Sequence, residues 1–391
     1  YGGSNIVEGR FDLQAFKAHI LDNATRLPSF MHDKCTRENV VRDYTAHGRP
    51  LPSFEPPKVE QSPNKRKGVR QIKYAQKRAE YTTAEAFKAF QISNKITYDS
   101  YKNIYNRVNF NELINSRINF FSNPEFKSWN KTIIKDDNVD PIFLVGFPRS
   151  GTTLLDTILR SHASIDVLEE KPLINNLIKE VKFKTNSDFS NLSKLDKNFI
   201  KKLRSSYFED FNNFLPMEKE KIYVDKFPLN IIYIAEINRI FPNSKYILAL
   251  RNPFDCVLSC FMQPFTPNEA MSNFYNLQDA AIFYDKVMEL WTYYENKLNL
   301  NFHTIKYEDT INNFDLNIRK LLNFLNLEWN DQLKEFYKTA EKRGIINTPS
   351  YNQINQPLYK KSIGRWKNYE KHFEGIEPIL NKWSSKFNYL L

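Results

Sequence analysis

The sequence predicts an α/β fold in which a parallel, P-loop-type sheet is flanked by helices. Short apolar runs of β-forming residues alternate with segments whose apolar residues recur at helical spacing. The first of these runs leads directly into a glycine-bearing turn and then a helix, the arrangement of a phosphate-binding loop. The predicted strands are Ile142–Val145, Ile222–Val224, Lys245–Leu250 and His303–Lys306.

Composition limits the class of protein. Of the 391 residues, 41% are hydrophobic and 15% aromatic, which is enough for a large core. No apolar run approaches the roughly 18 residues needed to cross a bilayer, so a soluble protein without a membrane partner is expected. Three cysteines without metal-ligand spacing favour a reducing, cytoplasmic setting and no metal. The chain starts at Tyr1 rather than methionine, so its true start and any targeting segment stay open.

The formal net charge of +11 predicts attraction to anions. That charge is compatible with four kinds of anionic partner: nucleic acid, an anionic membrane, a phosphorylated nucleotide and an acidic substrate. Net charge alone does not distinguish among them.

Residues 1–85 are expected to form an N-terminal extension. Phe11–Leu21 has the spacing of a short helix, and the proline-rich stretch Arg49–Pro63 reads as an extended linker. Lys65–Arg78 is strongly basic. It could be a nucleic-acid-binding arm. Runs of charge are more often a solvated helix face or a disordered linker, and this second interpretation is favoured.

Residues 86–391 are expected to form the main domain, with leading helices in 86–140 and an α/β core in 141–391. Between the strands, Ile165–Leu168 is a short apolar stretch, and Lys179–Lys221 reads as polar and irregular, helical in part and exposed. Helical spacing is present in Thr83–Lys135 (two or three helices), Leu154–Ser161, Asn230–Ile240, Ala280–Leu298 and Leu316–Leu325.

The loop after the first strand carries the strongest chemical signal. Gly146 and Gly151 have the spacing of a nucleotide-binding P-loop, but Thr152 occupies the position of the usual lysine, and Thr153 follows. Arg149 supplies a positive charge within the loop instead. Magnesium-assisted phosphoryl transfer needs that lysine and a metal-holding carboxylate, for which Asp225 is the available candidate. A P-loop kinase is therefore the weaker alternative.

Polar residues follow the ends of the predicted strands. Ligands of open α/β sheets bind outside the carboxyl ends of the strands. Four such residues are expected to share one site: Arg149, Lys226, Arg251 and Tyr307.

Three motifs carry a resemblance to a known family: PIFLVGFPRSGTTLL with SHASIDVLEE, KYILALRNPFDCVLSC, and TPSYNQINQPLYKKSIGRWKNYE. In this order they resemble the sulfotransferases that use the donor PAPS (3′-phosphoadenosine 5′-phosphosulfate). The branch most similar contains protein-tyrosine sulfotransferases and bacterial sulfotransferases with tetratricopeptide repeats. The resemblance runs from about Phe87 to the end of the chain.

The resemblance implies roles for individual residues. The 5′-phosphosulfate end of the donor would be held by Arg149, Ser150, Gly151, Thr152 and Thr153. The 3′-phosphate would be held by Arg251 and Ser259, with Tyr307, Lys360, Gly364 and Arg365 also beside the nucleotide. Lys226 falls on the family's catalytic lysine and Glu170 on its general base, so the expected catalytic residues are Glu170, Lys226 and Arg149.

Other readings of these residues stay open. Glu169 and Glu170 read alone as a solvated acidic pair, and His162 is a second candidate base or a packing residue. Arg251 has Asp255 as a possible ion-pair partner, and Asp309 is a candidate helix cap. The chain departs from the family at Ala163, where proline is usual, and at Glu169, where the bacterial branch has glycine. No tetratricopeptide pattern precedes Phe87, which leaves the acceptor open.

We therefore expect an enzyme that moves a sulfuryl group from PAPS to a hydroxyl or phenol. The candidate acceptors are a protein tyrosine, a glycan and an acidic peptide. Fixed cations stabilise the charge on the leaving phosphate oxygen, and a carboxylate accepts the acceptor's proton. The alternatives are the ATP-dependent kinase and a nucleic-acid-binding protein acting through the basic arm.

Overall fold

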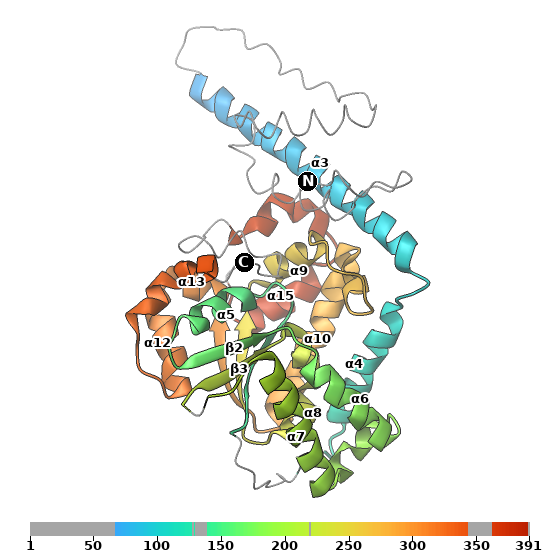
Figure 1. The fold of residues 1–391 in the computed structure, drawn as a ribbon. Coiled ribbons are helices and arrows are strands. Elements are labelled where there is room, and N and C mark those ends of the chain that lie inside the picture. Colours follow the sequence, from blue (N-terminus) through green and yellow to red (C-terminus); the bar gives the residue numbers. More distant parts are fainter. Residues whose placement is uncertain (1–66, 127–128, 130–138, 219, 343–361, 390–391) are drawn as a thin grey trace, which may run out of the picture.

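A five-stranded parallel sheet forms the centre of the protein (Figure 1). The computed structural model describes residues 67–126, 129, 139–218, 220–342 and 362–389, with side chains from residue 83 onward. The strand order is β2-β3-β1-β4-β5, which confirms the predicted α/β class. The strands are β1 (Ile142–Gly146), β2 (Ile165–Glu169), β3 (Ile222–Lys226), β4 (Lys245–Leu250) and β5 (Asn301–Lys306). The apolar stretch after Ser164 is thus a strand.

Strand β1 lies in the middle of the sheet, and every one of its residues is buried. Ile142 and Leu144 belong to one hydrophobic cluster, whereas Phe143 and Val145 belong to the other. Successive side chains of a strand point to opposite faces, so a strand with helices on both sides must be apolar throughout. The uninterrupted run of apolar residues therefore has a direct structural cause.

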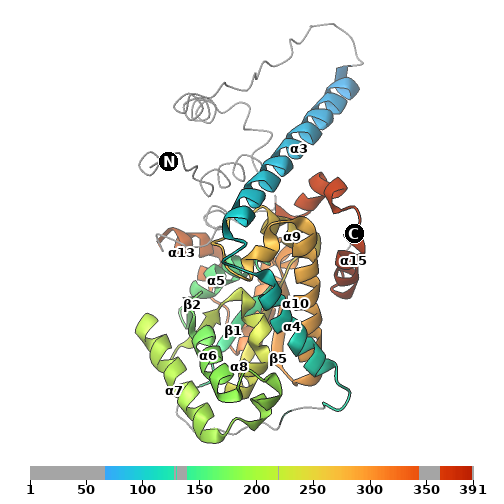
Figure 2. The same cartoon turned by 90° about the vertical axis from the view of Figure 1, so that its right-hand side faces the viewer.

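The helices cover both faces of the sheet (Figures 1 and 2). One face carries α5 (Thr152–Arg160), α12 (Phe314–Leu325) and α13 (Phe336–Lys342). The other carries α4 (Arg107–Ser122), α6 (Leu173–Thr185), α7 (Lys197–Phe214), α8 (Ile234–Ile240), α9 (Pro253–Phe261) and α10 (Leu277–Lys297). The short helix α11 (Tyr307–Asn312) follows β5 directly.

The segment Lys179–Lys221 differs from its prediction. It contains the end of α6 and the whole of α7, which begins where the Asp196 side chain accepts a hydrogen bond from the Phe199 N–H. One side of α7 is buried, with Leu203, Tyr207 and Phe211 in the core. The expected partial helix is confirmed, but the segment is more regular and more buried than predicted, because lysines and asparagines on the solvent face dilute the apolar periodicity.

Helix α3 (Lys67–Tyr101) runs without a break across the expected boundary between residues 85 and 86. Its second half packs on the core, since the Asn94 amide donates to the Phe261 carbonyl at 3.0 Å. The division of the chain at that point stays a prediction. The expectations for Phe11–Leu21 and Arg49–Pro63 lie outside the described residues.

The C-terminal elements pack on the same side as α9 and α10. The 3₁₀ helix η6 (Arg365–Phe373) and α15 (Glu377–Lys386) contribute Trp366, Phe373 and Trp383 to the core. Over the described parts of the chain, no helix combines the length and apolarity that crossing a membrane requires.

Strand β3 separates two adjacent charged residues. Asp225 lies on the α7 face, where it accepts a hydrogen bond from the Tyr207 hydroxyl at 3.0 Å, whereas Lys226 contacts Asp156 of α5 on the opposite face. Asp225 is therefore not a metal-holding carboxylate beside the β1–α5 loop. Burial raises the pKa of Asp225 to about 7.

This raised pKa predicts a pH-dependent stability. The folded state holds the Asp225 proton more tightly than the unfolded chain, with a pKa of about 7 against 3.8. Its contribution to stability is therefore present at low pH and lost as pH rises through about 7. The stability of Asp225→Asn relative to wild type should increase between about pH 5 and about pH 8, measured by urea unfolding. A stability difference that stays constant over this range would contradict a raised pKa.

Candidate active site at the carboxyl edge of the sheet

The β1–α5 loop places a bare helix N-terminus at the carboxyl edge of the sheet. Gly151 precedes α5 with φ +99°, in the left-handed region that favours glycine, and a Cβ there would approach the Tyr307 ring at 2.9 Å. Since glycine has no side chain to cap the helix, the first N–H groups of α5 remain available to a ligand. Thr152 and Thr153 open the helix and are buried. Such an N-terminus suits an anion.

Three arginines gather beside this loop: Arg149, Arg251 and Arg365, here called the arginine cluster. Arg149 donates from Nε to the Ser259 hydroxyl at 3.1 Å. Arg251 donates to the carbonyls of Arg149 and Ser362, at 3.3 and 2.7 Å, and its guanidinium lies over the Tyr307 ring. The predicted nucleotide-binding residues from the loop, from α9 and from the C-terminal segment thus lie together.

The electrostatics of the arginine cluster differ from those of the buried arginines elsewhere. Burial first, and then the positive charges of Arg251 and Arg365, lower the pKa of Arg149 to about 10. In the core, by contrast, Arg117 pairs with Glu236 and Arg204 with Asp140. A bound anion would relieve the repulsion among the three guanidinium groups.

Several polar atoms of this region are buried without a hydrogen-bond partner within the described chain. They are Ser150 Oγ, Arg251 Nε, Ser362 Oγ and Arg365 Nη2. A buried polar group without a partner costs roughly 1–3 kcal/mol. Their concentration around the loop fits a ligand that carries several acceptor oxygens, such as a phosphate.

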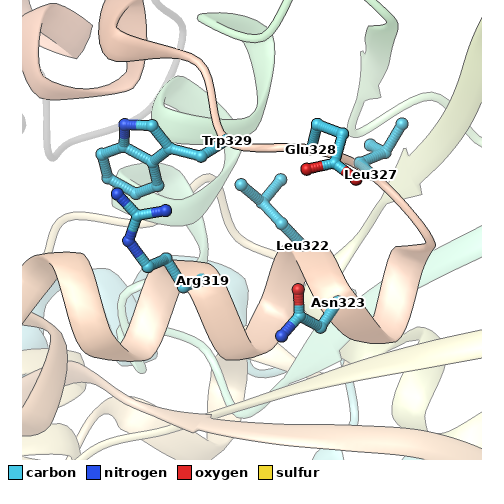
Figure 3. Close-up of a pocket in the computed structure, with 6 residues that line it drawn as sticks. All are labelled: Arg319, Leu322, Asn323, Leu327, Glu328 and Trp329. Carbon is cyan, nitrogen blue, oxygen red and sulfur yellow. The ribbon is translucent and has the colours of Figure 1, made fainter.

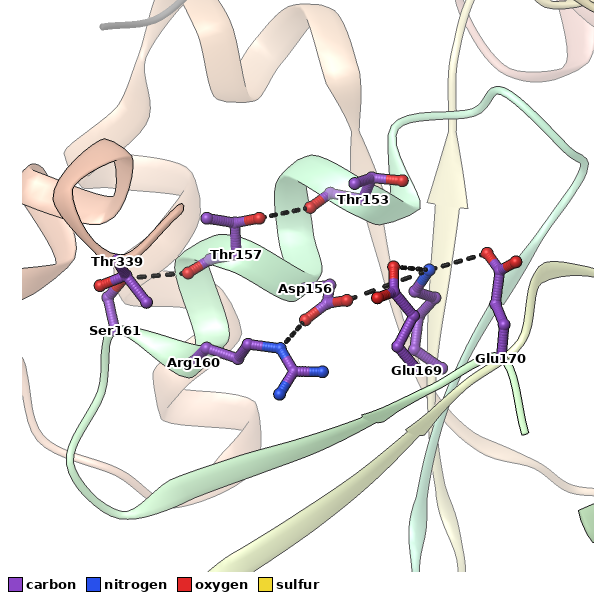
Figure 4. Close-up of polar contacts among 9 residues, drawn as sticks. Thr153, Asp156, Thr157, Arg160, Ser161, Glu169, Glu170 and Thr339 are labelled. Carbon is purple, nitrogen blue, oxygen red and sulfur yellow. Dashed lines mark hydrogen bonds and ion pairs between the residues drawn. The ribbon is translucent and has the colours of Figure 1, made fainter. Parts of the chain in front are cut away.

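The second group of charges surrounds Lys226, the last residue of β3, and Figure 4 labels its carboxylate neighbours Asp156, Glu169 and Glu170. Its Nζ lies 3.0 Å from Glu169, 2.8 Å from Glu170 and 3.9 Å from Asp156, and the side chain is fully buried. We call these four residues the lysine cluster. Burial favours the neutral amine, but the three carboxylates more than offset it, so that the pKa of Lys226 is raised. Lys226 is therefore a fixed cation.

The backbone is strained at two of the predicted site residues. Arg149 has φ +71° and Glu170 φ +48°, in the left-handed region. In the described chain, the other five non-glycine residues with positive φ are four asparagines and one serine. Asparagine adopts the left-handed conformation more readily than most residues do. Residues with a strained backbone cluster at functional sites, so the conformations of Arg149 and Glu170 fit a role in one.

Most of the predicted site residues lie at this edge. The two clusters contain Arg149, Glu170, Lys226, Arg251 and Arg365, with the remaining predicted residues around the loop: Ser150, Gly151, Thr152, Thr153, Ser259, Tyr307 and Gly364. Lys360 lies outside the described residues.

Three alternative readings can be compared with the structure. His162 is buried and contacts the Glu328 carbonyl and the Ser164 N–H, so it packs away from both clusters. Asp309 is not the cap of α11, because the helix begins at Tyr307. Arg251 donates to backbone carbonyls, and both oxygens of Asp255 accept backbone N–H groups of the C-terminal segment.

Sequence reasoning missed two carboxylates. Asp156 is fully buried and contacts Arg160 as well as Lys226; a carboxylate on an otherwise apolar helix face was the available signal. Asp255 was considered only as a partner of Arg251, and no local pattern indicates that it binds a segment more than a hundred residues away.

A hollow outside this edge contains none of the predicted site residues (Figure 3). It lies between α12 and the chain that follows, where the Arg319 guanidinium covers the Trp329 ring at 4.1 Å. Its lining gives no indication of a ligand.

The chain is similar to known proteins over the part that contains the sheet. Residues 141–331, which contain β1 to β5 and the three carboxylates that contact Lys226, match the family described as the sulfotransferase family. An uncharacterized protein from Aquifex aeolicus is 28% identical over 254 residues, covering 63% of this chain and 33% of that protein. Protein-tyrosine sulfotransferase 1 from Danio rerio is 23% identical over 234 residues, covering 58% of this chain and 65% of that one.

Among solved structures, the sulfotransferase domain from the curacin biosynthetic pathway aligns with a TM-score of 0.48 and 20% identity, over 66% of this chain and all of that one. The chain spans one third and about two thirds of the length of the two curated relatives named above. The resemblance expected from the three motifs is confirmed: residues 141–331 of this chain match the sulfotransferase family.

Proposed function

We propose that the protein transfers a sulfuryl group from PAPS to a hydroxyl or phenol. The observation that carries the proposal is the grouping of the arginine cluster, the bare N-terminus of α5 and the Lys226 ammonium at the carboxyl edge of the sheet. The arginine cluster and the helix N-terminus suit a nucleotide with a phosphate at its 3′ position and an anionic group at its 5′ position.

The arginine cluster suits the 3′-phosphate. Arg251 and Ser259 belong to α9 and the residues before it, and Arg365 approaches from the C-terminal segment. A dianionic phosphate would accept hydrogen bonds from the unpartnered Arg251 Nε and Arg365 Nη2 within the described site. It would also neutralise the mutual repulsion that lowers the pKa of Arg149, after the larger effect of burial.

The N-terminus of α5 and Lys226 suit the other end of the donor. PAPS supplies an activated sulfuryl group on its 5′-phosphate. The N–H groups of Thr152 and Thr153 would hold the phosphosulfate oxygens, and the Lys226 ammonium would stabilise the charge that builds on the bridging oxygen as its bond to sulfur breaks. The raised pKa of Lys226, which its carboxylate neighbours cause against the effect of burial, keeps that charge in place.

Glu170 is the proposed general base. Its side chain is 40% exposed, whereas that of Glu169 is 13% exposed. An acceptor arriving from solvent therefore meets Glu170 first. As the new oxygen–sulfur bond forms, the acceptor hydroxyl gives its proton to the Glu170 carboxylate, and the bisphosphate leaves with the bridging electron pair. Glu169 and Asp156 remain to balance the charge of Lys226.

The acceptor is proposed only by class. The net charge of +11 favours an anionic molecule such as an acidic peptide around a tyrosine, or an anionic glycan. The similarity to a protein named as a protein-tyrosine sulfotransferase supports the peptide.

Binding of the product nucleotide distinguishes this proposal from a kinase. Adenosine 3′,5′-bisphosphate at 100 times its dissociation constant should add about 2.7 kcal/mol of stability, seen as a rise in Tm. ATP with magnesium should add much less, because the loop lacks the lysine that holds its outer phosphates. Stabilisation by ATP and not by the bisphosphate would contradict the proposal.

The two neighbouring glutamates provide a matched pair of variants for the base. Glu170→Gln should lower kcat by roughly 10²- to 10⁴-fold, the usual contribution of general base catalysis, and keep bisphosphate binding. Glu169→Gln changes the same charge on the same ammonium but leaves the base in place, so its loss should be much smaller. The turnover of both variants is measured as the transfer of a radiolabelled sulfuryl group from PAPS to a panel of tyrosine peptides and glycans. A large loss in Glu169→Gln with normal turnover in Glu170→Gln would assign the base to Glu169.

A further inference from the structure

Asp255 joins two parts of the chain that are distant in sequence. Its Oδ2 accepts a hydrogen bond from the Gly364 N–H at 2.6 Å, and its Oδ1 accepts one from the Trp366 N–H at 2.9 Å. The carboxylate is buried, with 1% of the residue exposed. Buried carboxylates are stable only where hydrogen bonds or charges satisfy both oxygens, and these two N–H groups do so.

The α9 end of this contact is rigid. Asn252 caps the helix by accepting hydrogen bonds from the N–H groups of Phe254 and Asp255, and Pro253 occupies the first turn. Phe254 in turn stacks on Trp366, with ring centroids 4.4 Å apart. Asp255 is thus presented in one orientation at the start of a capped, buried helix.

The C-terminal end of this contact contains Arg365. Its two neighbours along the chain, Gly364 and Trp366, are the residues whose N–H groups Asp255 holds. Arg251 binds the same segment from the other side, through the Ser362 carbonyl. Gly364 has φ +68°, so the backbone between these anchors adopts a left-handed conformation that favours glycine.

We propose that Asp255 is a positioning residue for recognition of the 3′-phosphate: its carboxylate holds the segment Ser362–Trp366 so that Arg365 joins Arg149 and Arg251. This inference rests on the proposed function, because it needs a donor with a 3′-phosphate. It assigns to Asp255 the selectivity between nucleotides that have that phosphate and nucleotides that lack it.

A positioning role for Asp255 and a purely electrostatic role predict opposite effects on phosphate binding when the charge of Asp255 is removed. A negative carboxylate close to the arginine cluster repels a bound phosphate, so removing its charge alone would tighten binding. Removing a positioning contact would instead weaken it. Asp255→Asn keeps the size of the side chain but turns one acceptor into a donor that faces an N–H group. The two accounts therefore predict changes of opposite sign.

The experiment compares two nucleotides that differ only in the 3′-phosphate. Dissociation constants for adenosine 3′,5′-bisphosphate and adenosine 5′-monophosphate are measured by calorimetry on the full chain. In Asp255→Asn we expect bisphosphate binding to weaken by about tenfold or more, the effect of losing roughly one charge-assisted hydrogen bond, with monophosphate binding unchanged.

Asp285→Asn is the matched control. Asp285 also binds the C-terminal region, because it accepts hydrogen bonds from Trp383 Nε1 and Lys382 Nζ, but it does not contact the segment around Arg365. Its substitution should lower stability without changing the ratio of the two affinities. Gly364→Ala serves where Asp255→Asn fails to fold. A Cβ at Gly364 meets no atom within 4 Å, so alanine strains only the backbone and should reproduce the selective loss.

The outcomes separate the two levels of the proposal. A wild-type chain that does not bind the bisphosphate more tightly than the monophosphate overturns the proposed function and this inference together. A wild-type chain that prefers the bisphosphate, with Asp255→Asn and Gly364→Ala keeping that preference or strengthening it, overturns the role of Asp255 alone.

Discussion

The grouping of three arginines at one edge of the sheet is the constraint on which the architecture of this site depends. Arg149, Arg251 and Arg365 lie at one edge of the sheet, and Arg251 and Arg365, together with burial, lower the pKa of Arg149. Holding such a cluster together requires rigid supports. The buried sheet, the capped helix α9 and the Asp255 contacts to the C-terminal segment supply them. A multiply charged anion would form charge-assisted hydrogen bonds with these guanidinium groups.

The lysine cluster meets the opposite constraint. There a single buried ammonium has three carboxylates around it, so the cation is stable before any ligand binds. Asp156 connects it to α5, whose N-terminus forms the anion site, and strand register places Glu169 directly beside Lys226. One helix therefore relates the two clusters, with its N–H groups between them. The left-handed backbone of Glu170 turns the most exposed of the carboxylates toward solvent.

The features that could be predicted from the sequence are those that depend on a short stretch of neighbouring residues. Four strands, the loop and the polar residues that follow the strand ends could be predicted, because buried parallel strands are apolar throughout and end at one edge of the sheet. The fold of Lys179–Lys221 could not, since its buried face is diluted by polar residues on the other side.

Contacts between distant segments were also beyond prediction. Asp255 and Gly364 are more than a hundred residues apart, and the pairing of Asp156 with Lys226 depends on how α5 crosses β3. The proposed role of Glu170 comes from the family resemblance, because Glu169 and Glu170 taken alone are better read as a solvated acidic pair. In each case tertiary packing, rather than a local pattern, decides the neighbour.

The measurement that tests the account most directly is a crystal structure with adenosine 3′,5′-bisphosphate bound. The account predicts the 3′-phosphate in contact with Arg251 and Arg365, and the 5′-phosphate at the N-terminus of α5 within hydrogen-bond distance of Lys226. A nucleotide bound in the reverse orientation, or bound away from both clusters, would contradict it.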